Sequence, residues 1–386
     1  MTEDRDPIYL DHNATTPVHP EVLEAMLPYL REQFGNPSSS HAYGQRAHAA
    51  VERAREQIAA LLGCAADEIV FTSGGTEANN LAIRGTLAAA ETRRHIVTST
   101  VEHPATARPC AHLEARGYEV TRVPVNADGQ VCPEEVRPFV RGDTALVTVM
   151  LAQNETGTVM PVRRIADLAH AQGAAMHTDA AQAVGKIPTD VAELGVDLLS
   201  LAGHKLYAPK GVGALYVRRG TRLQPLLLGA GHERGLRPGT ENVAGLVGLG
   251  QACALAQQDL DVESGRQRVL LVELWQALRT AVPGLQLNGH SEQRLPNTLN
   301  LSFPGVRGSA VLAAVPEVAA STGSACHEGG EAPSAVLIAM GLDPITALGA
   351  VRLSLGRSTT REQIATAVTS LVRGYRDAAR ATGQAQ

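Results

Sequence analysis

The sequence is poor in aromatic residues, which make up 3% of its 386 residues. It also lacks any long block of basic or acidic residues, and its formal net charge is −5. Proteins that bind single-stranded nucleic acid use stacked aromatic rings and basic grooves, and those that bind membrane surfaces use basic segments. We therefore expect neither nucleic acid nor a membrane among its partners. The hydrophobic share of 44% and the charged share of 19% are typical of a globular chain.

Paired cysteines are also lacking. The chain has an odd number of cysteines and no Cys-x-x-Cys pair, the five being Cys64, Cys110, Cys132, Cys253 and Cys326. This pattern disfavours a disulfide framework or a zinc site, so we expect no metal. The first residues have no apolar core of a signal peptide, and the apolar stretch Val243–Leu255 is too short to span a bilayer. We expect a cytoplasmic location.

Short apolar runs alternate with helical patterns through the first two thirds of the chain. Seven runs read as strands: Ile69–Thr72, His95–Ser99, Glu119–Val123, Ala145–Met150, Ala175–Thr178, Leu198–Leu201 and Ala214–Val217. Such alternation predicts an α/β fold with a mostly parallel sheet between helices.

The pattern changes after about residue 250. A helix over about Val262–Ala281 is followed by short strands near Leu285–Leu287, Thr298–Ser302 and Ala350–Ser354, and then by a final helix. We expect a large domain over residues 16–255 and a smaller α+β domain over residues 256–386. The segment 1–15 is expected to lie on the smaller one.

Polar residues follow several of these strands, where open α/β sheets bind ligands. Lys205 lies in a glycine-broken loop, and desolvation there would favour its nucleophilic free amine. Asp179 ends a buried strand, where a carboxylate is costly unless it is paired. His103 follows another strand, the one over His95–Ser99. Lys205 and His103 each have a plainer alternative, because on its own Lys205 suits a solvated loop lysine and His103 a hydrogen-bonded loop residue. The stretch Ser73–Thr76 suits either a phosphate site or a simple helix cap.

Taken in order, these features suit one cofactor, pyridoxal 5'-phosphate. Its phosphate needs free N–H groups, its pyridine nitrogen a carboxylate, and its aldehyde a lysine amine. A ring stacked on His103 would be held flat.

Eight segments resemble the cysteine desulfurase family, which is closely related to selenocysteine lyase. They run in register from about residue 8 to about residue 360: Asp11–Pro17, Thr72–Glu77, Asn154–Gly157, His177–Gln182, Gly203–Lys205, Arg237–Asn242, Gly323–Cys326 and Val351–Arg357. The resemblance implies the fold of type I pyridoxal-phosphate enzymes and a homodimer. It also implies conversion of L-cysteine to L-alanine with a persulfide on Cys326, which a sulfur-acceptor protein such as an iron–sulfur scaffold would receive.

The resemblance also implies roles for individual residues. Lys205 would bind the aldehyde and move the α-proton, and His103 would stack on the ring and act as an acid or base. The remaining cofactor contacts would come from Gly75, Thr76, His204 and a second subunit's Thr240 at the phosphate, Asp179 at the pyridine nitrogen and Gln182 at the phenolic oxygen. Asn154 and Arg352 would bind the substrate carboxylate.

Cys326 lies in a loop of small residues, where mobility suits a sulfur carrier. A charged His327 would lower the pKa of its thiol, whereas a buried structural cysteine is the ordinary alternative. A serine that many family members carry near the phosphate is replaced by Ala202, so that contact is not expected. The residues after Cys326 resemble selenocysteine lyases, so that activity stays the alternative. A scaffold protein with a decayed site and a generic aminotransferase fit less well.

Overall fold

We describe a computed structural model that covers residues 6–322, 326–327 and 330–381. A seven-stranded sheet forms its larger part, in the order β2-β8-β7-β6-β5-β3-β4. Strand β8 runs antiparallel to both of its neighbours, and the other six strands share one direction. The strands are β2 (Ile69–Thr72), β3 (His95–Ser99), β4 (Glu119–Val123), β5 (Thr144–Thr148), β6 (Ala175–Asp179), β7 (Leu198–Ala202) and β8 (Gly213–Val217). The expected α/β fold with a mostly parallel sheet is confirmed.

Both faces of this sheet are covered by helices, because alternate strand residues point to opposite sides. On β3, Ile96 joins the apolar cluster under α3 and α4, while Val97 joins the cluster under α2, α6 and α8. The helices of this part are α1 (Pro20–Arg31), α2 (Ala42–Leu62), α3 (Gly75–Ala89), α4 (Pro104–Glu114), α5 (Pro133–Val136), α6 (Val162–Ala171), α7 (Val191–Leu194) and α8 (Val243–Ala281).

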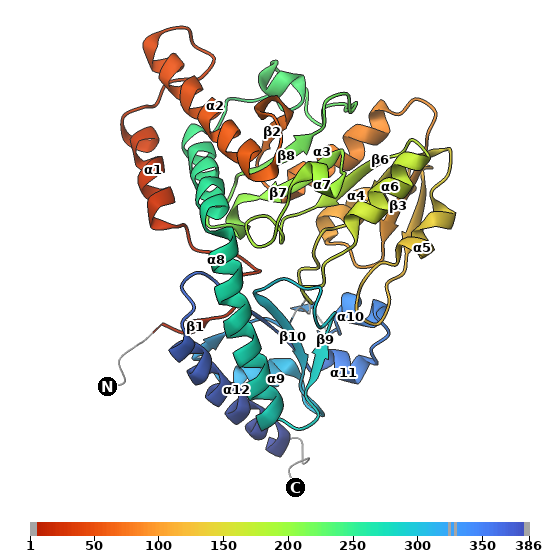
Figure 1. The fold of residues 1–386 in the computed structure, drawn as a ribbon, viewed down its shortest axis with the longest axis vertical. Helices are drawn as coiled ribbons and strands as arrows, with labels where there is room; N and C mark the ends of the chain where they lie inside the picture. Colours follow the sequence, from red (N-terminus) through yellow and green to blue (C-terminus); the bar gives the residue numbers. More distant parts are fainter. Residues whose placement is uncertain (1–5, 323–325, 328–329, 382–386) are drawn as a thin grey trace.

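A second apolar core surrounds a three-stranded antiparallel sheet in the order β14-β10-β9. Its strands are β9 (Gln286–Asn288), β10 (Thr298–Ser302) and β14 (Ala350–Ser354), and its helices are α9 (Gly308–Ala313) and α12 (Arg361–Ala381). The short helices α10 (Ala335–Ala339) and α11 (Pro344–Leu348) contribute their buried apolar residues to the larger core. The long helix α8 runs from the larger sheet to this smaller one (Figure 1). Helix α8 is continuous through residue 255, where the sequence suggests a boundary between two domains. That domain boundary stays a prediction.

The N-terminal segment joins the smaller core. Strand β1 (Ile8–Tyr9) pairs in parallel with β11 (Val318–Ala319), and Leu10 is fully buried among the apolar residues of that core. The next residues then cross to the larger part, where the main-chain N–H of Thr16 donates to the carbonyl of His204 at 3.0 Å. Residues 8–16 therefore lie at the junction of the two cores.

Two element boundaries differ by two or more residues from the sequence-based expectation. Helix α8 begins at Val243 rather than near Val262, because its glycines pack closely against other helices. Strand β5 ends at Thr148, since the chain beyond it leaves the sheet and the N–H of Met150 donates to Glu102 at 3.0 Å.

Candidate active site

A cavity of about 420 Å³ lies at the carboxyl ends of the parallel strands, between the two cores. Nine of the predicted site residues line it: Gly75, Thr76, His103, Asn154, Asp179, Gln182, His204, Lys205 and Arg352. They come from strand ends, helix starts and loops that are far apart in the sequence. The cavity is of the size that small-molecule ligands occupy in proteins.

Lys205 lies in the short 3-10 turn Gly203–Lys205 that follows β7 (Leu198–Ala202). Its Nζ donates to the main-chain carbonyls of Asn13 at 2.6 Å and Ala14 at 2.7 Å. Burial, helped by the positive charge of Arg352, lowers the pKa of its amine from 10.5 to about 8. The fraction of free amine near neutral pH is therefore much larger than in a solvated lysine, as a nucleophile requires.

Asp179 ends β6 and is almost fully buried. One carboxylate oxygen accepts from Asn79 Nδ2 at 2.6 Å and the other from the N–H of Ala181 at 2.9 Å. These bonds hold the carboxylate at the cavity wall. Asn79, on α3, is a positioning residue that the sequence analysis missed, and no signal in the sequence distinguishes it from other polar helix residues.

His103 precedes α4 and caps it, since Nδ1 of its ring accepts from the N–H of Ala105 at 3.1 Å. This bond leaves the Nε2 atom to carry the proton of the neutral ring. Burial lowers the pKa of His103, and the opposing attraction of Asp179 is smaller. The ring is therefore held neutral at the cavity wall.

Glu102, immediately before His103, is a second residue that the sequence analysis missed. Its Oε1 accepts from Ser99 Oγ at 2.6 Å and from the N–H of Met150 at 3.0 Å. Burial raises the pKa of this carboxyl to about 8. The carboxyl joins the chain after β3 to the chain after β5, and so fixes the loop that carries His103.

The start of α3 is suited to an anion. Gly74, at φ 148°, precedes the helix, and no side chain caps the helix there. Uncapped N–H groups and the helix dipole attract a phosphate. A Cβ on Gly75 would lie 3.2 Å from Cβ of Ala202, so small residues keep this end of the cavity open. Burial lowers the pKa of the adjacent His204 to about 4, which keeps its ring neutral.

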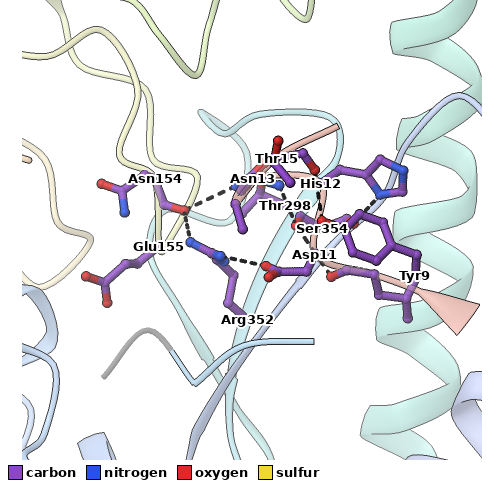
Figure 2. A network of polar contacts seen from close by, with 12 residues as sticks. Tyr9, Asp11, His12, Asn13, Thr15, Asn154, Glu155, Thr298, Arg352 and Ser354 are labelled. Carbon is purple, nitrogen blue, oxygen red and sulfur yellow. Dashed lines mark hydrogen bonds and ion pairs between the residues drawn. The ribbon is translucent and has the colours of Figure 1, made fainter. Parts of the chain in front are cut away.

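Arg352, on β14, is held by residues of two other segments (Figure 2). Its Nη2 donates to the carboxylate of Asp11 at 2.6 Å and its Nη1 to the carbonyl of Asn154 at 3.2 Å, while its Nε has no partner among the described residues. The guanidinium is almost entirely buried. No sequence pattern indicates that a carboxylate of the chain itself, Asp11, pairs with this cation.

Asn13 was not among the residues predicted from the sequence, yet its hydrogen bonds connect several residues of the site. Its main-chain carbonyl accepts from Gln182 Nε2 at 2.9 Å as well as from Lys205. Its side chain donates to Thr298 Oγ1 at 2.9 Å and to the carbonyl of Asn154 at 3.2 Å (Figure 2). Asn13 lies within a segment that the resemblance highlights, which was the only available signal.

Two predicted residues, Thr240 and Cys326, are not among the nine residues named above. Thr240 is exposed and lies outside the cavity, which leaves its contribution to a second subunit a prediction. Cys326 belongs to the short strand β12 (Cys326–His327), which pairs with β13 (Gly330–Glu331). The side chain of Cys326 is outside the part of the chain that the structure describes. That Cys326 reaches the cavity therefore stays a prediction.

The residues present fit pyridoxal phosphate. An uncapped helix start, a buried carboxylate and a lysine of lowered pKa share one cavity, as the phosphate, the pyridine nitrogen and the aldehyde require. In the described part of the chain, no group of three or more His, Cys, Asp or Glu side chains could hold a metal ion. No helix there is both long and apolar enough to cross a membrane.

Comparison with known proteins agrees with this architecture. The family model described as Aminotransferase class-V matches residues 8–366. A cysteine desulfurase of Trichormus azollae is 50% identical over 359 residues, which cover 92% of this chain and 90% of that protein. A cysteine desulfurase IscS of Dictyoglomus turgidum is 46% identical over 360 residues, which cover 92% of this chain and 91% of that protein.

Solved structures give the same result. A NifS-like protein superposes with a TM-score of 0.89 at 36% identity, over 95% of this chain and 98% of that one. A structure described as SspA in complex with cysteine has a TM-score of 0.80 at 37% identity, over 90% of this chain and 98% of that one. The chain therefore belongs to the class-V aminotransferase family, among the cysteine desulfurases.

Proposed function

We propose that this chain is a pyridoxal-phosphate-dependent cysteine desulfurase, which converts L-cysteine to L-alanine and leaves the sulfur as a persulfide on Cys326. The observation that carries the proposal is the cavity in which Lys205, with its lowered pKa, and the buried Asp179 lie beside the uncapped start of α3. Membership of the cysteine desulfurases supports the same reaction.

Each cofactor group has candidate partners in the cavity. Lys205 would hold the aldehyde covalently, Asp179 the pyridine nitrogen and Gln182 the phenolic oxygen. The phosphate would be held by Gly75, Thr76, His204 and the partner's Thr240, and the ring would stack on His103. When bound, the pyridine ring withdraws electrons from the α-carbon of the substrate, which is chemistry that protein side chains lack.

Residues of the chain itself would bind the substrate and accept its sulfur. Arg352 and Asn154 hold the substrate carboxylate, which aligns the α-proton with the amine of Lys205. The thiolate of Cys326 attacks the substrate sulfur, so that an S–S bond forms and the Cβ–S bond breaks. The electron pair of that bond, with a proton, completes the methyl group of alanine, while Cys326 keeps the sulfur as a persulfide.

The persulfide has to be passed on before the next turnover. An acceptor thiol attacks its outer sulfur, which restores the thiol of Cys326 and makes the acceptor the persulfide carrier. A protein that assembles iron–sulfur clusters is such an acceptor, and some relatives carry the name IscS. A homodimer would bring Thr240 of one copy to the phosphate site of the other. We propose that the enzyme works in the cytoplasm.

The decisive experiment measures alanine and sulfide formed from L-cysteine by the protein loaded with pyridoxal phosphate, with dithiothreitol as the acceptor. We expect equal amounts of both products from the wild type. Cys326→Ala and Lys205→Ala should each lower the rate at least about 100-fold, because each removes a nucleophile. Cys132→Ala is the matched control for loss of a cysteine and should leave the rate unchanged.

The absence of alanine from the wild-type reaction would overturn the proposal. Selenocysteine is the second substrate to test, since the alternative lyase activity releases selenium without needing the cysteine. If Cys326→Ala keeps full activity on selenocysteine while the wild type prefers it to cysteine, the chain is a selenocysteine lyase.

A further inference from the structure

Lysine is rare in this chain, which contains only Lys186, Lys205 and Lys210. Lys210 is exposed, whereas Lys205 and Lys186 are largely buried near the cavity. The proposed reaction uses Lys205 and gives no role to Lys186. A buried lysine costs stability, so its presence beside the site calls for an explanation.

Lys186 has few partners. Its Nζ donates to Oε1 of Gln182 at 2.8 Å, and the next polar atom is Oδ1 of Asn13 at 3.5 Å. In the described part of the chain, no carboxylate lies within ion-pair distance of this amine. Burial, together with the positive charges of Lys205 and Arg352, lowers the pKa of Lys186 to about 7. Hydrogen bonding to Gln182 is therefore its principal polar interaction.

This hydrogen bond and one to the Asn13 carbonyl together determine which way the Gln182 amide points. The two ends of a glutamine amide have nearly the same shape but opposite hydrogen-bonding character. The protonated amine of Lys186 has no acceptor and its neutral form still carries two donor hydrogens, so the end of the amide that meets Lys186 is the oxygen. The NH₂ end then lies on the other side, where it donates to the carbonyl of Asn13 at 2.9 Å. That same carbonyl accepts from Lys205 at 2.6 Å.

We propose that Lys186 is a positioning residue, which fixes the orientation of the Gln182 amide so that a donor always lies beside Lys205 in the cavity. The inference rests on the proposed function, since the donor would serve an oxygen of bound pyridoxal phosphate. Without Lys186, the amide oxygen loses its hydrogen-bond partner, and only the bond to the Asn13 carbonyl still opposes a turn that would present the oxygen to that ligand oxygen and repel it.

The test is a double-mutant cycle with Lys186→Met, Gln182→Leu and the double variant. Methionine resembles lysine in length and cannot donate. Binding of pyridoxal phosphate to the apoprotein is followed by the absorbance of the bound cofactor. We expect each single variant to weaken binding about 5-fold or more, and the double variant to bind no more weakly than Gln182→Leu. Lys210→Met, which removes an exposed lysine, should bind like the wild type. Multiplicative losses in the double variant would overturn the inference.

A second measurement needs no cofactor. In urea unfolding of the apoprotein, each single variant leaves one buried polar group without its partner, so we expect a lower midpoint. The double variant removes both groups and should recover most of the loss. Additive losses would show that the two side chains act separately, and would overturn the inference. Failure of the wild type to bind pyridoxal phosphate would instead overturn the proposed function, and the unfolding cycle would still decide the role of Lys186.

Discussion

Lys205 shows how the fold gives one side chain its chemistry. A solvated lysine is almost fully protonated at neutral pH and is a poor nucleophile. Here the amine is buried between two main-chain carbonyls and close to Arg352, which lowers its pKa to about 8. Asp11 and Asp179 oppose this effect without cancelling it.

The first prediction concerns the pH dependence of cofactor attachment. Because the pKa of Lys205 is lowered, the protonated and unreactive form predominates below about pH 8 and the free amine above it. The rate at which apoprotein incorporates pyridoxal phosphate should therefore rise with pH and level off above about pH 8. Stopped-flow absorbance between pH 6.5 and 10 measures this rate. A lysine-containing peptide is the control, and its rate should still be rising at pH 10, because its amine has a pKa of about 10.4. A rate that keeps rising to pH 10 in the protein would contradict the prediction.

Individual residues differ in how well the sequence reveals them. The sequence singles out Lys205, Asp179 and His103 because each comes at or after the end of a recognisable strand, and all three line the cavity. Asn13 and Asn79 were not, since their roles depend on hydrogen bonds to residues at least 100 positions away in the chain. Nothing in the local pattern around an asparagine reports such a partner.

At the scale of elements, the start of α8 is the clearest departure from expectation. The sequence from Val243 to Leu255 is rich in glycine, which disfavours helices in isolation. In the structure these glycines lie where α8 meets other helices, as at Gly248 beside Met26 of α1 and Gly250 beside Ala54 of α2. Close packing offsets the low intrinsic propensity, and only the tertiary structure reveals this.

The second prediction compares two glycines of α8. A Cβ on Gly250 would lie 2.5 Å from Oε1 of Gln57 and 2.6 Å from Cα of Ala54, whereas one on Gly265 would meet nothing within 4 Å. We expect Gly250→Ala to destabilise the protein by about 1–3 kcal/mol through overpacking. Gly265→Ala, the matched control, should stabilise it by about 0.5–1 kcal/mol through helix propensity. Urea unfolding measures both, and a stabilising Gly250→Ala would show that the two helices can separate at little cost.

For the whole molecule, the important feature is that the site belongs to neither core alone. Asp179 and Lys205 come from the larger part, Arg352 comes from the smaller sheet, and Asp11 comes from the N-terminal segment that runs between them. The order of strands and helices along the chain was enough to predict the α/β fold. The pairing of the N-terminal segment with β11 and β14 was not predictable from local patterns, because its partners lie more than 300 residues away.

The last prediction tests whether this shared site couples the two cores. Arg352 is buried and pairs with Asp11, so Asp11→Asn leaves its charge without a counter-charge and should destabilise the protein by about 3 kcal/mol. The only tryptophan, Trp275, packs against the smaller core, so its fluorescence reports that core, while circular dichroism reports the whole chain. We expect both signals to move to lower urea concentration together in Asp11→Asn, because the ion pair lies at the junction of the cores. A tryptophan transition that moves alone would mean that the smaller core unfolds independently, and that the site does not hold the two parts together.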